Sequence, residues 1–253
     1  MEKQFTTDQL QVSIYDNPEV MGDAAADFVA ETINKAIQSK GEAHIILATG
    51  ASQFTFLKAL KTKDLDWKKI TVFHLDEYKG MAETHPASFR KYLKERILEE
   101  VAPRKIFYLN GDAENIDQVM QEYEDELKSH PIDIACIGIG ENGHIAFNDP
   151  PVADFNDKKW VKVVELDEPC RKQQFGEGWF PTMDDVPTEA LSLTIPAILH
   201  SKVISCVVPD ERKADAVHNT LYSEISTACP ATILRKHPNT KLFLDKASAT
   251  KLK

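Results

Sequence analysis

Short apolar runs alternate with amphipathic stretches along most of this chain, and the alternation predicts strands followed by helices. The apolar runs predict strands at Gln11–Tyr15, His44–Ala48, Ile70–His74, Lys105–Tyr108, Ile132–Ile137, Val161–Val164, Leu191–Thr194, Val203–Val208 and Lys241–Leu244. Helical spacing and capping residues predict helices at Pro18–Ser39, Gln53–Leu60, Pro86–Glu99, Asn115–Lys128, Asp210–Leu221 and Ala231–Lys236. The repeated order of strand then helix predicts the α/β class, with a doubly wound, mostly parallel sheet that carries helices on both faces.

No internal repeat, low-complexity tract or Gly/Ser linker divides the 253 residues, so we expect a single domain over 1–253. The least regular part is about 151–187, and it contains Gly176–Pro181, where two glycines stand beside two aromatic residues. A long irregular stretch of this kind is either a lid over a site or a surface excursion packed by its own tryptophan.

Composition narrows the classes of function. The chain has 30 Lys and Arg against 40 Asp and Glu, a net charge of −10, which argues against nucleic acid as the main partner. A phosphorylated small molecule remains compatible, because a few placed cations and backbone amides can hold one phosphate. No apolar run reaches the roughly 18 residues of a membrane helix, and Met1–Thr7 lacks the apolar core expected of a signal peptide. With four widely spaced cysteines, we expect a cytoplasmic protein with reduced thiols.

The most informative stretch is Gly138–Pro150, G-I-G-E-N-G-H-I-A-F-N-D-P, which directly follows the strand predicted at Ile132–Ile137. Its glycines let the backbone turn sharply. Ligands bind at the carboxyl ends of strands in α/β sheets, and imidazole titrates near neutral pH. His144 is therefore a candidate acid or base; the alternative is a glycine-rich turn whose histidine only satisfies backbone groups.

A second motif, Thr49-Gly50-Ala51-Ser52, separates the strand at His44–Ala48 from the next helix. Glycine permits close backbone approach and a helix N-terminus presents unpaired N–H groups, which together suit a phosphate. The motif matches neither the P-loop nor the dinucleotide-binding fingerprint. A plain strand-to-helix turn is the alternative.

Two adjacent carboxylates, Asp76 and Glu77, follow the strand at Ile70–His74. Successive side chains of an extended chain point to opposite sides, so one can face a cleft while the other is solvated or paired. A carboxylate shielded from water is a competent base for a proton next to a carbonyl. The alternative is a solvated acidic loop or a helix cap.

Arg171 and Lys213 are candidate phosphate-binding cations, although neither stands out from surface charges by itself. The eight histidines form no H-x-x-x-H pair and no Cys/His cluster, so we expect no metal site. A G-x-S-x-G nucleophile motif is absent from the sequence.

Taken in order, these elements resemble the glucosamine-6-phosphate deaminase/isomerase family over about residues 10–245. The specific elements are L-D-E-Y at Leu75–Tyr78 and the G-H-I-A-F-N segment of the His144 loop, supported by T-G-A-S and by H-P-x-S at His85–Ser88. The resemblance implies a modified Rossmann-like fold and an enzyme without metal or cofactor. Such an enzyme opens the ring of a hexosamine 6-phosphate, isomerises it and releases ammonia and fructose 6-phosphate.

The resemblance also implies roles by position. Asp76 matches the base that transfers a proton at C2, and His144 matches the ring-opening acid and base. Asn142 and Asp149 fall where the family places the carboxylates that flank this histidine. The implied binding residues for substrate and phosphate are Thr49, Gly50, Ala51, Ser52, Arg171 and Lys213, with Glu77 in support of the base.

The chain departs from the family at two of these positions. Asn142 stands where many members carry Asp; its amide can orient His144 but brings no charge to stabilise an imidazolium. Asp149 stands where Glu is usual, which withdraws the carboxylate by about 1.5 Å, the length of one C–C bond. The stretch after Pro150 lacks the small, Ser-rich, basic run of the allosteric members, so we expect no activation by N-acetylglucosamine 6-phosphate.

Three alternatives to glucosamine-6-phosphate deamination remain. Galactosamine-6-phosphate deamination differs only in the C4 epimer. A 6-phosphogluconolactonase shares the fold, but typically has D-E-R at Asp76–Tyr78 and a different loop at Gly143–Pro150. A sugar-phosphate sensor without catalysis would need neither Asp76 nor His144. The expected partner in each case is a small-molecule sugar phosphate, with a homo-oligomer left open.

Overall fold

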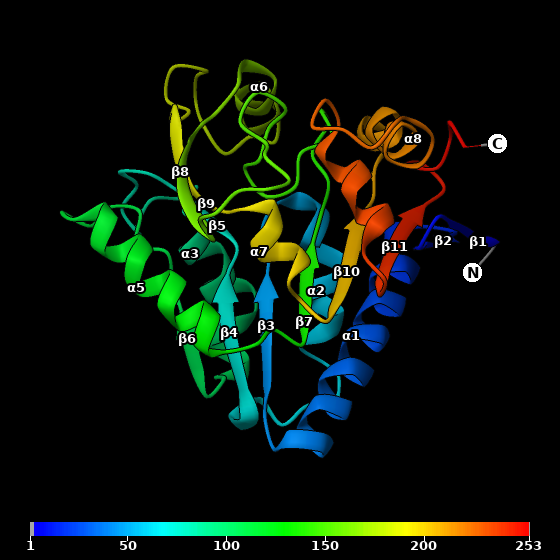
Figure 1. Ribbon diagram of the computed structural model, residues 1–253, viewed down its shortest axis with the longest axis horizontal. Helices are drawn as coiled ribbons and strands as arrows, with labels where there is room; N and C mark the ends of the chain where they lie inside the picture. The colour runs from blue at the N-terminus through cyan, green and yellow to red at the C-terminus, as the bar shows by residue number, and fades with distance from the viewer. Residues whose placement is uncertain (1–2, 253) are drawn as a thin grey trace.

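An eight-stranded sheet forms the centre of the computed structural model, which describes residues 3–252 (Figure 1). The strands lie in the order β1-β2-β11-β10-β7-β3-β4-β6, and only the edge pair β1 and β2 is antiparallel. Their bounds are β1 Lys3–Thr7, β2 Leu10–Tyr15, β3 Ala43–Leu47, β4 Ile70–His74, β6 Lys105–Phe107, β7 Ile134–Ile137, β10 Val203–Val208 and β11 Thr240–Asp245. The mostly parallel sheet confirms the fold class.

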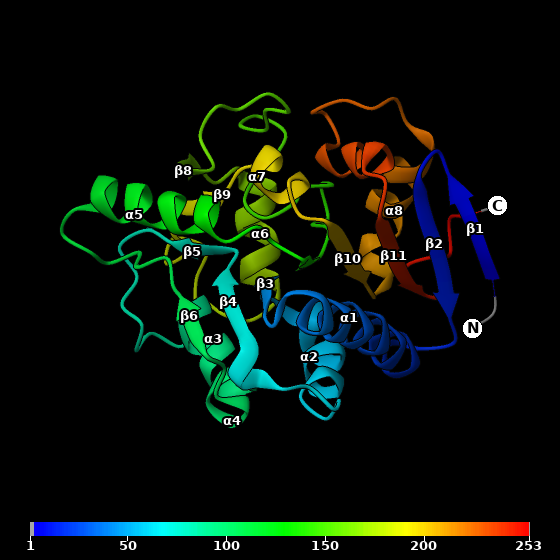
Figure 2. The ribbon, with the colours of Figure 1, turned by 60° about the horizontal axis from the view of Figure 1, so that its bottom comes forward.

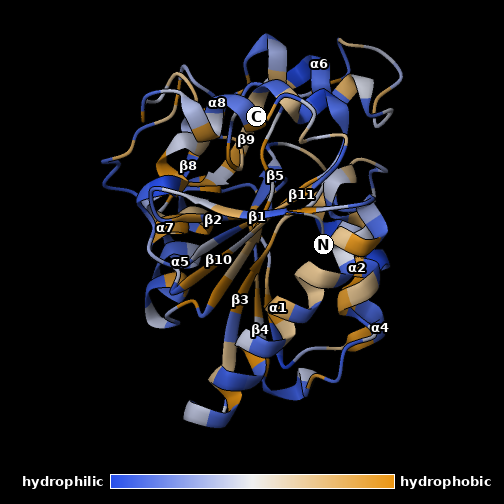
Figure 3. Cartoon of the chain, turned by 90° about the vertical axis from the view of Figure 1, so that its right-hand side faces the viewer, coloured by the Kyte–Doolittle hydropathy of each residue, from blue (hydrophilic) through white to orange (hydrophobic). Residues whose placement is uncertain are grey.

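Helices cover both faces of this sheet, so the central strands are buried on both sides and consist almost wholly of apolar residues (Figures 2 and 3). One face carries α1 (Pro18–Lys40), α2 (Phe54–Leu60), α3 (Phe89–Leu93) and α4 (Glu99–Val101), and the other carries α5 (Ile116–Ser129), α7 (Ile195–Leu199) and α8 (Ala214–Tyr222). The longest helix, α1, begins at its cap Asn17, whose side chain accepts from Val20 N–H, and ends at Gly41 in the left-handed conformation.

A second, antiparallel sheet lies beyond the carboxyl ends of the central strands (Figure 1). It consists of β5 (Asp76–Tyr78), β9 (Glu189–Leu193) and β8 (Val161–Glu165), and the helix α6 (Glu168–Gly176) follows β8. A separate apolar cluster that includes Tyr78 and Phe147 packs beneath α6. The stretch expected to be irregular, 151–187, therefore contains one strand and one helix.

The chain order reverses between two neighbouring central strands. After β3 the chain continues to β4 on one side, whereas after β7 it continues to β10 on the other. Such a switch point opens a crevice at the carboxyl ends of the strands. The Thr49–Ser52 turn follows β3 and the His144 loop follows β7, so both candidate motifs lie at this crevice.

Two helices differ from their predicted form. The helix expected over Pro86–Glu99 begins only at α3, where Ser88 accepts from Lys91 N–H as the cap, and it widens into a π turn over Lys94–Leu98 before α4. The segment Pro230–Lys236 is a 3-10 helix rather than an α-helix. The sequence analysis missed β1, β5, α6 and α7, three of which have only three to five residues and so show little periodicity.

Two further expectations concern composition. No helix among residues 3–252 is long and apolar enough to cross a membrane. All four cysteines are buried and unbridged, in agreement with the expected reduced thiols.

We predict that Gly22→Ala destabilises the protein through the contact between α1 and α2. A Cβ at residue 22 would lie 2.7 Å from the backbone carbon of Thr55 and 2.8 Å from the backbone nitrogen of Phe56, so the helices must separate. Overpacking of this kind costs about 1–3 kcal/mol, measurable by urea unfolding. The exposed change Ser39→Ala on the same helix is the control, and equal stability of the two variants would contradict the assignment.

Candidate active site

One pocket lies at the carboxyl ends of β10, β7, β3 and β4 and opens to solvent. This position is typical of small-molecule sites in α/β sheets. Its lining comprises Ala48, Thr49, Gly50, Ser52, Leu75, Asp76, Phe89, Gly138, Ile139, Gly140, His144, Ala146, Phe147, Gln173, Gln174, Glu177 and Lys213. The structure therefore brings together residues of the Thr49–Ser52 turn, Leu75 and Asp76, the His144 loop and Lys213.

Asp76 begins β5 and lines the pocket, although it is only 6 % exposed. Burial, together with the negative charge of Glu77, raises the pKa of Asp76 to about 8. A carboxyl group with this pKa can both release and take up a proton near neutral pH, as a general acid or base requires. Asp76 is thus well suited to move a proton on a ligand.

Glu77 points away from the pocket, as the alternation along a strand predicts. Its carboxylate is fully buried and accepts hydrogen bonds from Ser88 Oγ, from the backbone N–H groups of Tyr78, Phe89 and Arg90, and from Arg90 Nε. Burial raises the pKa of Glu77, and the hydrogen bonds at the start of α3 oppose that effect. Glu77 therefore does not line the pocket, and its contacts anchor β5 to α3 beside Asp76.

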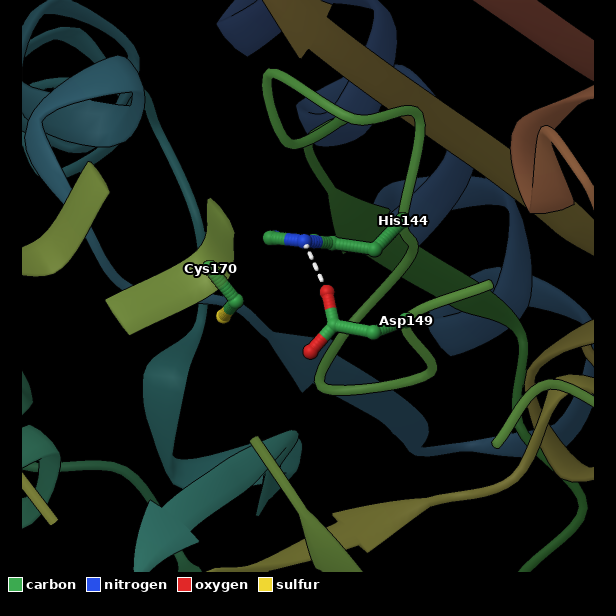
Figure 4. A group of neighbouring side chains, drawn as sticks. All are labelled: His144, Asp149 and Cys170. Carbon is green, nitrogen blue, oxygen red and sulfur yellow. Dashed lines mark ion pairs between the residues drawn. The ribbon is translucent and has the colours of Figure 1, made fainter. Parts of the chain in front are cut away.

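His144 and Asp149 form the second pair of titratable groups in the site (Figure 4). His144 Nδ1 lies 2.7 Å from Asp149 Oδ1, which leaves the opposite edge of the ring toward the pocket. Burial acts to raise the pKa of Asp149, but the hydrogen bonds from His144 and Asn142 and the charge of His144 outweigh it, and the pKa lies below its ordinary value. Asp149 therefore stays a carboxylate that fixes the orientation of the imidazole.

Asn142 organises the loop around this pair. Its Oδ1 accepts from His144 N–H at 3.0 Å, and its Nδ2 donates to Asp149 Oδ1 at 2.9 Å and to Asp167 Oδ2 at 3.4 Å. Burial and the charge of Asp149 leave the pKa of Asp167 above its ordinary value. The amide at position 142 thus joins two carboxylates without adding a third charge beside them.

Cys170 on α6 lies next to the same carboxylate (Figure 4), and ligand atoms of His144, Asp149 and Cys170 lie within 4.8 Å of one another. Burial and the charge of Asp149 raise the pKa of Cys170 well above its ordinary value. These two effects favour the neutral thiol at this position.

Gly140 lies so close to His144 that the loop leaves no space for a side chain there. A Cβ at residue 140 would lie 2.2 Å from the imidazole ring of His144. The backbone N–H of Gly140 also donates to His144 C=O at 2.9 Å, which closes the loop tightly. Any larger residue would displace the imidazole from Asp149.

The Thr49–Ser52 turn and Lys213 both line the pocket. Thr49, Gly50 and Ser52 line it, whereas Ala51 lines a neighbouring hollow together with Ser52 and Lys213. Gln53 Nε2 donates to Ser52 Oγ at 3.0 Å, so the Ser52 hydroxyl can donate its own proton to a ligand. Lys213 is only 5 % exposed, and burial lowers its pKa, although the charges of nearby carboxylates oppose the shift.

Arg171 does not line the pocket, contrary to the expectation from the sequence. Its guanidinium donates to the backbone carbonyls of Met183 and Val186 at 2.9–3.2 Å. Arg171 therefore ties α6 to the segment that follows it.

The residues that the sequence analysis missed come mainly from α6 and its end: Gln173, Gln174 and Glu177, together with Phe89 and Phe147. The capping sequence Asp167-Glu168-Pro169, with its proline in the first turn, is the signal that would have revealed α6. Trp179 packs against the rings of Phe54 and Tyr92, so the segment after α6 is held against the pocket rim. Its movement as a lid stays a prediction.

Comparison with known proteins agrees with this geometry. The family model for glucosamine-6-phosphate isomerases/6-phosphogluconolactonase matches residues 16–243. The chain belongs to this family.

Relatives within the glucosamine-6-phosphate isomerase/6-phosphogluconolactonase family include a glucosamine-6-phosphate deaminase of Listeria monocytogenes serotype 4a, 36 % identical over 88 % of this chain and 93 % of the relative. One of Bacillus cytotoxicus is 34 % identical over 84 % and 79 %. A solved monomeric glucosamine-6-phosphate deaminase has a TM-score of 0.85 at 32 % identity, covering 94 % of this chain and 98 % of that one. A 6-phosphogluconolactonase from Shewanella baltica, at 17 % identity, a TM-score of 0.77 and coverage of 95 % and 97 %, shares the fold.

We predict that Glu77→Ala lowers the free energy of unfolding by about 3–5 kcal/mol, because it removes the acceptor of Arg90 Nε, of the Ser88 hydroxyl and of three backbone N–H groups. The Arg90 guanidinium keeps its contacts with Asp112 and the Met81 carbonyl. Urea unfolding measures the change. The control is Glu83→Ala, which removes a partly exposed pair with Lys94 and should cost less than about 1 kcal/mol. Equal losses in the two variants would refute the anchoring role of Glu77.

Proposed function

We propose that this protein converts a hexosamine 6-phosphate and water into a ketose 6-phosphate and ammonia, with glucosamine 6-phosphate as the substrate and fructose 6-phosphate as the product. The observation that carries the proposal is the presence of two different proton-transfer groups in one pocket, Asp76 at the start of β5 and His144 in the loop after β7. Relatives at 34–36 % identity that bear the name glucosamine-6-phosphate deaminase support the same reaction.

His144 suits the first step, the opening of the sugar ring. Opening a hemiacetal moves a proton from the C1 hydroxyl and delivers one to the ring oxygen, and a neutral imidazole can carry out both transfers. The carboxylate of Asp149, 2.7 Å from Nδ1, fixes the tautomer and stabilises the imidazolium while it carries the extra proton. The role requires no charge at Asn142.

Asp76 suits the isomerisation that follows. Its carboxylate removes the proton from C2 of the open-chain amino aldehyde, which gives an enolamine, and returns a proton to C1. The C2 imine that results adds water and releases ammonia, which leaves the ketone. Because its proton is bound with a pKa of about 8, Asp76 can accept and return it with little driving force in either direction.

Ammonia release from the purified protein tests the proposal. The assay uses glucosamine 6-phosphate, with galactosamine 6-phosphate beside it to set the C4 preference and 6-phosphogluconolactone to test the hydrolase alternative. Ammonia together with fructose 6-phosphate supports the proposal. Lactone hydrolysis without ammonia would establish the lactonase instead, and binding of sugar phosphates without any turnover would establish a sensor.

We predict that kcat/KM rises with pH through about 8, since Asp76 acts as a base only after it loses its proton and its pKa is about 8. The change Asp76→Asn should lower kcat by about 10²–10⁴-fold and abolish this limb of the profile, while a sugar phosphate still binds. A profile that is flat between pH 5 and 8, or a variant that keeps wild-type kcat, would rule out Asp76 as the base.

We predict that Lys213→Met raises KM for the phosphorylated substrate about ten- to hundredfold, the value of one charge-assisted hydrogen bond, with a smaller effect on kcat. Steady-state kinetics measures both constants. The matched control is Lys172→Met, which removes an exposed cation of α6 that pairs with Glu168 outside the pocket. Unchanged KM in the Lys213 variant would remove this lysine from the phosphate site.

A further inference from the structure

A carboxylate is built into the end of the pocket where the phosphate is proposed to bind. Glu177 follows α6 and lines the pocket, and both of its oxygens are held. Gln173 Nε2 donates to Oε1 at 2.9 Å and Trp179 Nε1 donates to Oε2 at 3.2 Å. These two neutral donors fix the carboxylate without cancelling its charge.

Glu177 lies close to the lysine that is proposed to bind the phosphate. Ser52, Glu177 and Lys213 line the pocket and also a second hollow beside it, so the three share one rim. Among the charged groups that act on the Lys213 ammonium, Glu177 has the largest effect. A ligand group at this rim therefore meets one cation and one carboxylate.

Other cations near this rim are already engaged. Arg171 donates to backbone carbonyls, and Arg212 pairs with Asp210 at 2.9 Å and faces Glu141 at 3.7 Å. Of the described residues that line the pocket, Lys213 is the only lysine or arginine. The distal end of the pocket is thus balanced in charge, whereas a phosphate at neutral pH carries about −1.5 to −2.

We propose that Glu177 is a specificity-determining residue that weakens the preference for a phosphorylated substrate, so that the enzyme also deaminates the unphosphorylated hexosamine. A sugar hydroxyl both donates and accepts, so it can donate to Glu177 and accept from Lys213. A phosphate dianion can only accept, and it meets a like charge at Glu177. The inference rests on the proposed function, since it concerns the same reaction with a different distal group.

The test compares ammonia release from glucosamine 6-phosphate and from glucosamine in the wild type and in Glu177→Gln. In the wild type we expect turnover of both compounds, with values of kcat/KM that differ by less than about a hundredfold, because one lysine supplies most of the discrimination. In the variant we expect the ratio in favour of the phosphorylated compound to rise at least tenfold through a lower KM for it. The double change Glu177→Gln with Trp179→Phe, which removes the indole donor that a Gln amide would face, should do the same.

Glu168→Gln is the matched control, because Glu168 is an exposed carboxylate of α6 that pairs with Lys172 and does not line the pocket. Its ratio should stay at the wild-type value. A wild type that acts only on the phosphorylated compound, or a ratio that does not rise in either Glu177 variant, would overturn the inference and leave the proposed function intact. Absence of ammonia from both compounds would instead overturn the proposed function.

Discussion

The buried contact between Glu77 and the start of α3 is the constraint on which the site depends. Three backbone N–H groups, a serine hydroxyl and the guanidinium of Arg90 all converge on this one carboxylate. They fix β5 in position, and the alternation along a strand then turns Asp76 to the pocket. The charge of Glu77 also helps to keep the Asp76 proton in place, because two adjacent buried carboxyl groups disfavour ionisation of each other. This interaction thus fixes the position of the proposed base and adds to the effect of burial on its pKa.

The two ends of the pocket differ in how their charged and titratable groups are paired. At the reacting end, burial and the charge of Glu77 raise the pKa of Asp76, and Asp149 fixes the orientation of His144. Asn142 fits this arrangement, because a third carboxylate beside Asp149 and Asp167 would add repulsion in a buried loop. At the distal end, Lys213 and Glu177 offset each other, so the binding of the substrate there depends on the charge that it brings.

Much of the fold and of the reacting end could be predicted from the sequence, because the strands are continuous apolar runs and the motifs follow them directly. Asp76 and His144 belong to local patterns, strand and then turn, whose position at the carboxyl edge of a parallel sheet follows from topology. The distal end could not be predicted in this way. Glu177 reaches the pocket through α6, and Arg171 turns away to bind carbonyls of Met183 and Val186, contacts that arise only when the segment after β8 folds over the sheet. A strand of three residues, such as β5, is also too short to show its period.

The measurement that tests this account most directly is the titration of the Asp76 carboxyl carbon by ¹³C NMR, assigned by its disappearance in Asp76→Asn. The account predicts a midpoint near pH 8, since burial and Glu77 disfavour the carboxylate at this position. A midpoint near the ordinary value of 3.8 would contradict it, because an aspartate already ionised at neutral pH would be too weak a base for the proton transfer proposed here.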